Sequence, residues 1–422
     1  MRIPLLRRIG LGLAAACLPC AAPPSTAMAS PPSWTSRPSV VGFWAGEDVV
    51  TAHGRQPSGP DNYYEPAYRG ALTPAVWEVL REQHVPLYIN MRYGRDFGPV
   101  PAGTRSDATA LVRKANALGV PVIAWLVVPF KDGYWAYEGN AATMKTAARA
   151  WSSWKNAKRL RFSSVALDQE FSWRNLQTYI SLRLGGDTTG LTNWMSGNID
   201  PDGQCAAFRT YRDLISWAHD RGIAVTAAQA PMIADDLRDG KTALQDALNM
   251  TGSSPGYDQT YLMAYRSAVA QAASDPGPAY VASYYADMRT YFGRTGQVSL
   301  GIGGEAPYDT LTPMVNDVRM LTGLGAKQIP VYSLETTVDE FGAAGVQKIV
   351  EAARHPMKGT ELAAATRPTP FSEALRAASA QMDATATTLT QQVHPRGPNT
   401  WPGGCGDLTV RPLAHRPPAR GH

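Results

Sequence analysis

Residues 162–171 read Phe-Ser-Ser-Val-Ala-Leu-Asp-Gln-Glu-Phe. The apolar run Val165–Leu167 is short and leads directly into two carboxylates, Asp168 and Glu170. Such a run, followed at once by acids, predicts a buried strand with polar groups at its carboxyl end. Because side chains alternate across a strand, Asp168 and Glu170 are expected on the same side of it.

The same rhythm extends outward on both sides of this stretch, with short apolar runs alternating with amphipathic helical patterns. The predicted strands are Val40–Trp44, Leu87–Met91, Val120–Val127, Val165–Leu167, Ile223–Ala227, Thr260–Ala264, Val298–Gly301 and Gln328–Tyr332. Helices are predicted over 74–80, 106–118, 142–157, 206–220, 241–250, 280–292, 311–322 and 338–354. Strict alternation favours the α/β class and a (β/α)8 TIM barrel. An open doubly wound sheet is the alternative, but the Gly-rich phosphate turn after its first strand is missing.

Four segments follow from this pattern. Residues 1–29 are predicted to be a signal peptide, residues 30–39 an extended linker, and residues 40–355 the barrel. Residues 356–422 form a C-terminal tail with one helix (371–393) and a Pro-rich, extended end. The tail is expected to be an appendage rather than a second domain. The long connection 171–204 is expected on the face of the barrel where such enzymes build their sites.

The N-terminus has the pattern of a secretory signal. Arg2, Arg7 and Arg8 precede an apolar run from Ile9 to Ala22, and small residues end at Ala29. The run is shorter than the about 20 apolar residues that a membrane span needs. We therefore predict cleavage near Ala29, no stable membrane insertion, and a location outside the cell or in the periplasm or envelope. A twin-arginine route and a lipid anchor at Cys17 are weaker alternatives.

Composition excludes several function classes. The net charge of +5 loses the three leader arginines on cleavage and becomes +2, which gives no electrostatic footprint for nucleic acid. The seven His are not spaced as metal ligands, so no metal is expected. No cofactor is expected either. The protein is predicted to be a monomer. Cys205 and Cys405 remain after cleavage and could form a disulfide; two unpaired buried thiols are the alternative.

The acid pair suggests proton-transfer chemistry. Two neighbouring carboxyls separate their pKa values, because ionising one opposes ionising the other. One of them can then keep a proton near neutral pH and donate it to a leaving oxygen. Solvated loop acids without function are the alternative.

The same residues resemble the strand 4 signature of family-18 glycoside hydrolases, the chitinase-like group, which ends in Asp-x-Glu. Leu262-Met263-Ala264-Tyr265 is similar to the family's Met-x-Tyr. The resemblance implies that Glu170 is the acid/base, that Asp168 stabilises a substrate acetamido group acting as nucleophile, and that Tyr265 hydrogen-bonds that group. It implies a secreted, retaining hydrolase of a polysaccharide or glycan with N-acetylated sugars.

The chain also departs from that family. The earlier Asp positions of the signature are Ser163 and Ala166, and the Trp at the end of strand 8 has no counterpart in 332–335. These departures put the substrate and the way Asp168 is held in question.

Two other functions remain open. Gly303-Gly304-Glu305 ends strand 7 with a carboxylate, which resembles a large retaining group whose acid/base and nucleophile are Glu on strands 4 and 7. In that scheme Glu170 and Glu305 act on a polysaccharide without an acetamido group, although Gln169 stands where that group has Asn. The second alternative is an inactive barrel that only binds glycans.

Further side chains at strand ends are predicted to bind substrate. Aromatic faces suit sugar rings, and polar groups suit their hydroxyls. The predicted substrate-binding residues are Trp44, Trp125, Gln229, Met263, Tyr332 and Glu335.

Overall fold

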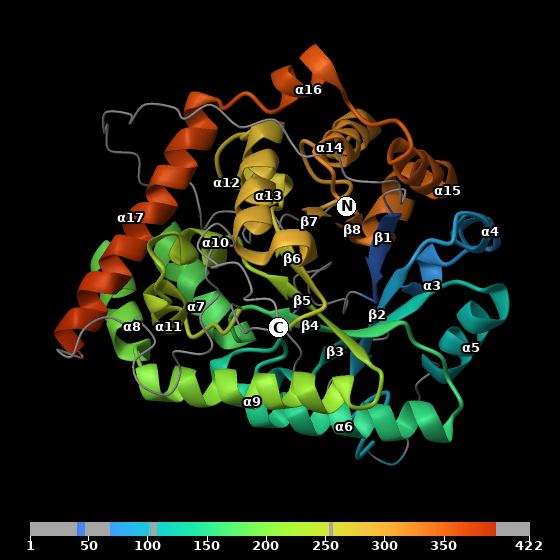
Figure 1. The fold of residues 1–422 in the computed structure, drawn as a ribbon, viewed down its shortest axis with the longest axis horizontal. Helices are drawn as coiled ribbons and strands as arrows, with labels where there is room; N and C mark the ends of the chain where they lie inside the picture. The colour runs from blue at the N-terminus through green and yellow to red at the C-terminus, as the bar shows by residue number, and fades with distance from the viewer. Residues whose placement is uncertain (1–39, 47–67, 101, 103–107, 253–255, 394–422) are drawn as a thin grey trace, which may run out of the picture.

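The predicted barrel is confirmed. The computed structural model describes residues 40–46, 68–100, 102, 108–252 and 256–393. Eight parallel strands close in the order β1 to β8, and β8 pairs with β1 (Figure 1). They are β1 (Val40–Ala45), β2 (Leu87–Arg92), β3 (Val122–Val127), β4 (Ser164–Gln169), β5 (Ala224–Gln229), β6 (Gln259–Met263), β7 (Gly296–Gly301) and β8 (Gln328–Tyr332). Each predicted strand is present, with ends shifted by no more than two residues.

Helices separate the strands and surround them. They are α3 (Tyr68–Ala71), α4 (Pro74–Glu82), α5 (Ala108–Leu118), α6 (Ala141–Ala157), α7 (Trp173–Leu184), α8 (Thr188–Asn198), α9 (Pro201–His219), α10 (Met232–Asp236), α11 (Ala243–Ala247), α12 (Arg266–Ala272), α13 (Pro278–Phe292), α14 (Leu311–Gly323), α15 (Leu334–Ala352), α16 (Gly359–Ala365) and α17 (Pro370–Val393). Four 3-10 turns complete the described elements: η2 (Phe130–Asp132), η3 (Glu138–Asn140), η4 (Leu237–Asp239) and η5 (Gly293–Thr295).

The long connection after β4 is mostly helical, which the sequence analysis did not predict. Ser172 begins α7 by accepting a hydrogen bond from the Asn175 N–H (3.1 Å). Asp187 does the same for α8 by accepting from the Gly190 N–H (2.7 Å). Such side chains satisfy N–H groups that the first helical turn leaves unpaired. These caps were readable in the sequence.

Two helices begin earlier than predicted. α9 begins at Pro201, directly after Asp200, whose side chain accepts from the Gly203 N–H (3.0 Å). α15 begins at Leu334, capped by Ser333, and therefore contains Glu335 in its first turn. Proline at the first helical position and a hydroxyl cap are both favourable starts. The shorter helices α3, α10, α12 and α16 were not predicted.

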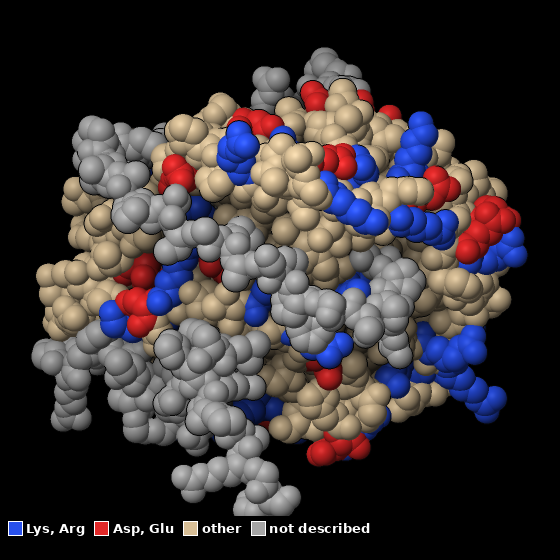
Figure 2. Space-filling model, turned by 45° about the horizontal axis from the view of Figure 1, so that its top comes forward, with Lys and Arg blue, Asp and Glu red and all other residues tan. Residues whose placement is uncertain are grey.

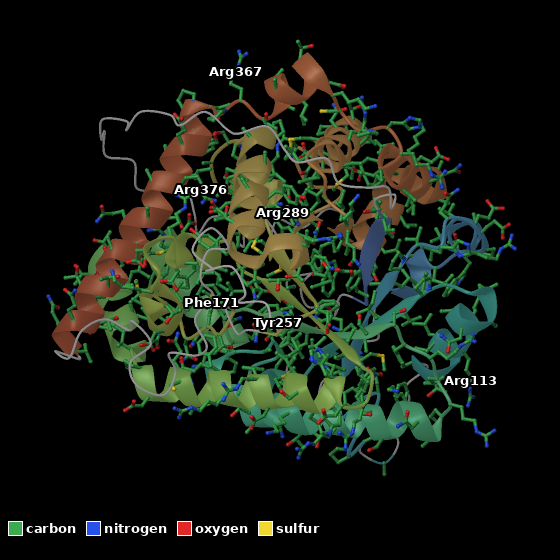
Figure 3. All side chains as sticks on the ribbon, viewed as in Figure 1. Arg113, Phe171, Tyr257, Arg289, Arg367 and Arg376 are labelled. Atoms are coloured by element: carbon green, nitrogen blue, oxygen red, sulfur yellow. The ribbon has the colours of Figure 1, made fainter. Side chains whose placement is uncertain are left out.

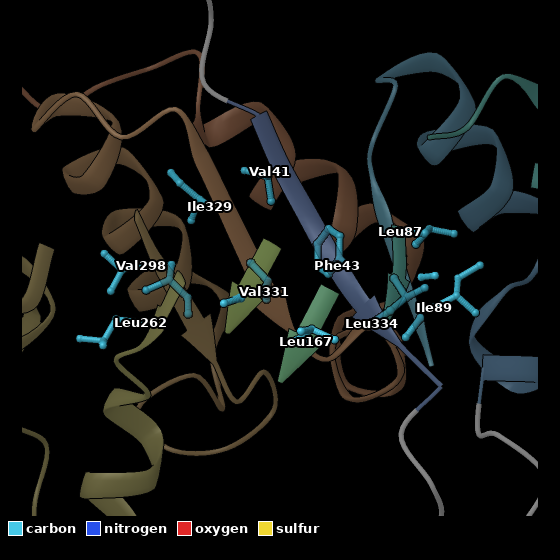
Figure 4. Close-up of a cluster of buried hydrophobic side chains, with 14 of the residues drawn as sticks. Val41, Phe43, Leu87, Ile89, Leu167, Leu262, Val298, Ile329, Val331 and Leu334 are labelled. Carbon is cyan, nitrogen blue, oxygen red and sulfur yellow. The ribbon is translucent and has the colours of Figure 1, made fainter. Parts of the chain in front are cut away.

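The core forms two layers on the two faces of the barrel wall. Alternate strand residues such as Phe43, Ile89 and Leu262 face outward and pack under the helices (Figure 4). The residues between them, among them Trp44, Trp125 and Tyr261, fill the barrel interior. The strands are therefore apolar on both faces, as expected for a parallel sheet covered on both sides. The inner layer lies inside the barrel, directly below the carboxyl ends of the strands.

The C-terminal helix α17 lies along the edge of the barrel beside α8, α10, α11 and α13 (Figure 1). It covers the predicted helix 371–393 and buries Leu375, Ala386 and Leu389. The predicted leader, the linker 30–39 and the Pro-rich end lie outside the described residues. Within the described part of the chain, no helix combines the length and apolar character of a membrane span.

Candidate active site

The structure places Asp168 and Glu170 together at the carboxyl end of β4. Asp168 is 4% exposed and Glu170 is half-buried. The loop after β3 holds this stretch: the Ala136 N–H donates to the Asp168 carbonyl (2.8 Å), and the Glu170 N–H donates to the Ala136 carbonyl (3.1 Å). This short bridge fixes the backbone on both sides of Gln169, so that both acids point from a rigid strand end.

Burial dominates the electrostatics of the pair. It raises the pKa of Asp168 well above its usual range, and the Glu170 carboxyl raises it further through its charge and a hydrogen bond. Burial also raises the pKa of Glu170 to about 7, partly offset by the hydrogen bond from Asp168. Loss of hydration disfavours the charged form of any carboxyl. The pair therefore retains a proton near neutral pH, as the sequence pattern suggested.

Trp125 lies next to Asp168. Its indole N–H completes no hydrogen bond in the structure, but it opposes the larger effect of burial on the pKa of Asp168 by lowering it. Trp125 pairs in register with Ala166, the position at which the chitinase-like signature carries an acid. Ala166 is fully buried in the barrel interior. In this protein Ala166 and the indole of Trp125 therefore occupy the place of a second inner carboxyl. The other departure from the signature, Ser163, precedes β4 and is exposed.

Aromatic rings connect the acid pair to β6 and β8. The Trp125 ring contacts Tyr332 edge-on, with centroids 6.4 Å apart. Tyr332 in turn stacks on Tyr265. Trp44 packs against Trp125 from β1 at 5.3 Å. Predicted residues from four strands thus meet at one end of the barrel, and Met263 lies buried in the same inner layer.

A second group of rings surrounds Trp173, and sequence reasoning missed its members Phe130, Tyr134 and Trp135. The loop after β3 stacks Phe130 on Tyr134 with centroids 4.2 Å apart, and Trp135 packs against Trp173 of α7 at 5.6 Å. The Trp173 N–H donates to the Gly133 carbonyl (2.9 Å), which ties α7 to this loop. Because Ala136 of the same loop clamps β4, these rings lie next to the acids. The aromatic Gly-Tyr-Trp run at 133–135, in the loop that follows a predicted strand, was the available signal.

A buried polar network fixes Tyr134. Its hydroxyl accepts from the Asn90 amide (3.0 Å), and the Asn90 oxygen accepts from Arg95 (3.1 Å). Arg95 forms an ion pair with Asp96 at 2.7 Å, and both side chains are nearly inaccessible to solvent. Buried charges are tolerated when paired and hydrogen-bonded. The network orients the loop that carries the rings.

Three predicted residues are engaged elsewhere. Gln229 is fully buried, and its amide donates to the Gly252 carbonyl instead of facing the barrel interior. Glu335 is 5% exposed, and its carboxylate accepts from the Gly46 N–H (2.5 Å), which joins the end of β1 to α15. Glu305 lies on the loop after β7 and accepts from the Gln271 amide (2.8 Å). Strand alternation explains Gln229, since Ala228 rather than Gln229 belongs to the inner layer.

The remaining site predictions concern cysteines and metals. Cys205 lies in α9, but Cys405 is outside the described residues, so their disulfide stays a prediction. Among the residues that the structure describes, no group of three or more His, Cys, Asp or Glu is arranged to hold a metal ion.

Comparison with known proteins gives structural neighbours at low similarity. No family model matches the chain, and no curated protein does. The glycoside hydrolase domain of PgaB (BpsB) from Bordetella bronchiseptica is 13% identical, with a TM-score of 0.45 over 76% of this chain and 100% of that one. A GH18 chitinase from Pseudoalteromonas aurantia is 11% identical, with a TM-score of 0.41 over 74% and 100%. A GH5-4 endoglucanase from an uncultured bacterium is 11% identical, with a TM-score of 0.46 over 74% and 94%. At these values the likenesses assign neither a family nor an activity to this chain.

Proposed function

We propose that this protein is a glycoside hydrolase in which Glu170 is the general acid/base and Asp168 assists it. The observation that carries the proposal is the buried, hydrogen-bonded pair of Asp168 and Glu170 at the carboxyl end of β4, beside aromatic rings from β1, β3, β6 and β8. Active sites of TIM barrels are built at that end of the strands. Flat rings suit the apolar faces of sugars, and a carboxyl that keeps its proton suits protonation of a glycosidic oxygen.

Glu170 performs two proton transfers in this scheme. At or below about pH 7 it carries a proton and donates it to the glycosidic oxygen as the bond to the anomeric carbon breaks. Its carboxylate then takes a proton from the water that attacks the same carbon, which restores the starting state. Asp168 stays protonated because burial raises its pKa, so it places no negative charge beside Glu170 before the proton has left Glu170.

The substrate's own acetamido group is the proposed nucleophile. Its oxygen attacks the anomeric carbon from the opposite face, and the water reopens the resulting ring with net retention. Asp168 would accept the acetamido N–H, and the Tyr265 hydroxyl would donate to its oxygen. The ring contacts from Asp168 through Trp125 and Tyr332 to Tyr265 support this assignment, because they bring both groups to one end of the barrel.

Paired substrates test the nucleophile. Chitooligosaccharides and cello-oligosaccharides of equal length differ mainly at the 2-position, where the former carry the acetamido group. We expect hydrolysis of the chitooligosaccharides with retention at the anomeric carbon, measured by NMR of the first product. Inversion, or equal rates on both series, would contradict the acetamido mechanism.

A second candidate replaces that nucleophile by Glu305. Its favouring observation is that Glu305 is half-buried on the loop after β7, where Gln271 holds its carboxylate. In this case Glu305→Gln abolishes turnover of cello-oligosaccharides. In the acetamido mechanism Glu305→Gln retains most of the activity on chitooligosaccharides.

A further inference from the structure

A basic hollow lies on the side of the barrel, far from the acid pair. It lies between the carboxyl-terminal parts of α6 and α9, which run side by side in Figure 1, and has a volume of about 490 Å³. Arg149 and Lys155 line it from α6, and Trp217 and Arg221 from α9 and the turn after it. These four residues define what we call the basic hollow.

The cations of the basic hollow are not neutralised. Among the described residues, no ion pair joins Arg149, Lys155 or Arg221 to a carboxylate, whereas Lys145 of α6 pairs with Asp213 of α9 at 3.2 Å. On the same two helices, Asp213 therefore neutralises Lys145, whereas no Asp or Glu is among the residues that line the hollow. Three like charges around one depression repel each other and attract an anion.

Trp217 holds two of these cations in place. The Arg221 guanidinium lies 4.8 Å from the centre of the Trp217 ring, and the Arg149 guanidinium lies 5.9 Å from it. Cation–π contacts restrict side chains that would otherwise move freely. Arg221 also donates to the Trp217 carbonyl (3.1 Å), which leaves its other N–H groups for a ligand. Guanidinium groups held in this way suit the paired oxygens of a carboxylate.

We infer that the basic hollow binds the carboxylate of an acidic polysaccharide. The inference deepens the proposed function and depends on it for one point, that the polymer is a carbohydrate. Ser153 and Asn156, which also line the hollow, supply neutral groups for sugar hydroxyls. A second attachment point on a polymer raises the local concentration of its other segments at the acid pair.

The position of the hollow excludes direct participation in the reaction. α6 follows β3 and runs back along the barrel, so its last residues lie near the amino ends of the strands, opposite Asp168 and Glu170. Ile223, which precedes β5, lines the hollow on that side. A strand of six residues such as β4 spans about 20 Å. Only a ligand of several sugar units reaches both places.

The surface does not favour nucleic acid as the ligand. Nucleic-acid sites use a basic stripe that follows many phosphates. On the face shown in Figure 2, Lys and Arg side chains are interspersed with Asp and Glu over the described surface. The three unpaired cations are confined to one hollow, and Trp217 is half-buried beneath its guanidiniums instead of presenting a free face to a base.

Affinity electrophoresis tests the inference with two forms of one polymer. Polygalacturonate carries carboxylates, and its fully methyl-esterified form does not. The wild-type protein should be retarded by polygalacturonate and not by the ester. Arg149→Ala/Arg221→Ala should raise the apparent Kd by about tenfold or more, as expected for loss of charge-assisted hydrogen bonds. The matched control Arg113→Ala/Arg212→Ala removes two exposed arginines elsewhere and should keep the wild-type Kd.

Several outcomes would overturn the inference. One is an equal loss of retardation in both double variants, and another is equal retardation of the wild type by the esterified polymer. The inference also fails if single-stranded DNA binds as strongly as polygalacturonate, or if equimolar inorganic phosphate fully displaces polygalacturonate from the protein. Both double variants should hydrolyse a short neutral oligosaccharide at the wild-type rate. If the wild-type protein binds polygalacturonate but hydrolyses no sugar, the proposed function is refuted, whereas the inference that the basic hollow binds carboxylates is supported.

Discussion

The rings of Tyr265 and Tyr332 are stacked, with centroids 5.7 Å apart and an angle of 14° between their planes. Tyr265 lies just after β6 and Tyr332 ends β8, and these two strands are separated by β7 in the barrel. The stack passes over Gly301 at the end of β7, where an added Cβ would lie 3.0 Å from two carbons of the Tyr265 ring. The missing side chain at Gly301 therefore allows two aromatic residues of the candidate site to meet.

Gly301→Ala should displace Tyr265 by a few tenths of an ångström. Overpacking of this kind costs about 1–3 kcal/mol of stability, and we expect turnover to fall further because in the proposed mechanism the Tyr265 hydroxyl donates to the acetamido oxygen. Thermal unfolding and kcat measure the two effects. Gly325→Ala is no suitable control because its φ is +92°, whereas Gly70→Ala has free space around its Cβ and should change neither quantity. Unchanged kcat in a folded Gly301→Ala protein would remove Tyr265 from the mechanism.

The raised pKa of Glu170 makes stability depend on pH. Because burial raises the pKa in the folded state from 4.5 to about 7, the folded protein loses relative stability as pH rises through this window. Glu170→Gln lacks this loss. We expect the variant to exceed the wild type by about 2 kcal/mol in free energy of unfolding at pH 8, and by little at pH 4.5. Urea unfolding at both pH values checks this, and a difference independent of pH would contradict it.

A second group of acids combines half-buried Glu138 of η3 with Asp200, which caps α9, and buried Asp246 of α11. Burial, followed by the charges of Asp246 and Asp200, raises the pKa of Glu138 to about 9. The folded state therefore loses stability as pH rises from about 4.5 to about 9. Glu138→Gln should be more stable than the wild type at pH 8, and by more than Glu170→Gln is, because the pKa of Glu138 is raised further. Asp202→Asn, an exposed acid nearby, is the control and should leave the urea midpoint unchanged.

Arg376 attaches α17 to the barrel. Its guanidinium pairs with Asp235 at 2.9 Å and with Asp287, and it lies 3.7 Å from the centre of the Tyr284 ring. Figure 3 shows its label between α17 and α13, whereas Arg367 lies at the edge of the molecule. Arg376→Ala leaves buried Asp235 with the more distant Arg238 (3.9 Å) as its ionic partner and should cost about 3–5 kcal/mol.

Arg367→Ala is the matched control for that variant, because Arg367 is exposed on the same C-terminal segment. Its melting temperature should equal that of the wild type. Equal melting temperatures for both arginine variants would show that α17 contributes little to the fold.

Periodicity predicted the strands well because each of them is buried on both faces, so that an apolar run of five or six residues had no competing explanation. It predicted Asp168 and Glu170 as a pair for the same reason, since alternation along β4 is local. Gln229 shows the limit of that reasoning: one residue of register decides between the barrel interior and the Gly252 carbonyl. Tyr134 and Trp135 were missed because their positions depend on contacts distant in sequence. Ala136 pairs with β4, and Asn90 of β2, held by Arg95 from the loop after β2, bonds Tyr134.

The kcat of Glu170→Gln on a chitooligosaccharide tests the central claim most directly. Gln keeps the size and hydrogen-bonding capacity of Glu but cannot donate a proton, so kcat should fall by a factor of about 10² to 10⁴ while substrate binding stays near the wild-type level. The wild-type kcat/KM should decline above about pH 7, where Glu170 loses its proton. Glu373→Gln, an exposed substitution, should match the wild type. Wild-type turnover by folded Glu170→Gln would contradict the account.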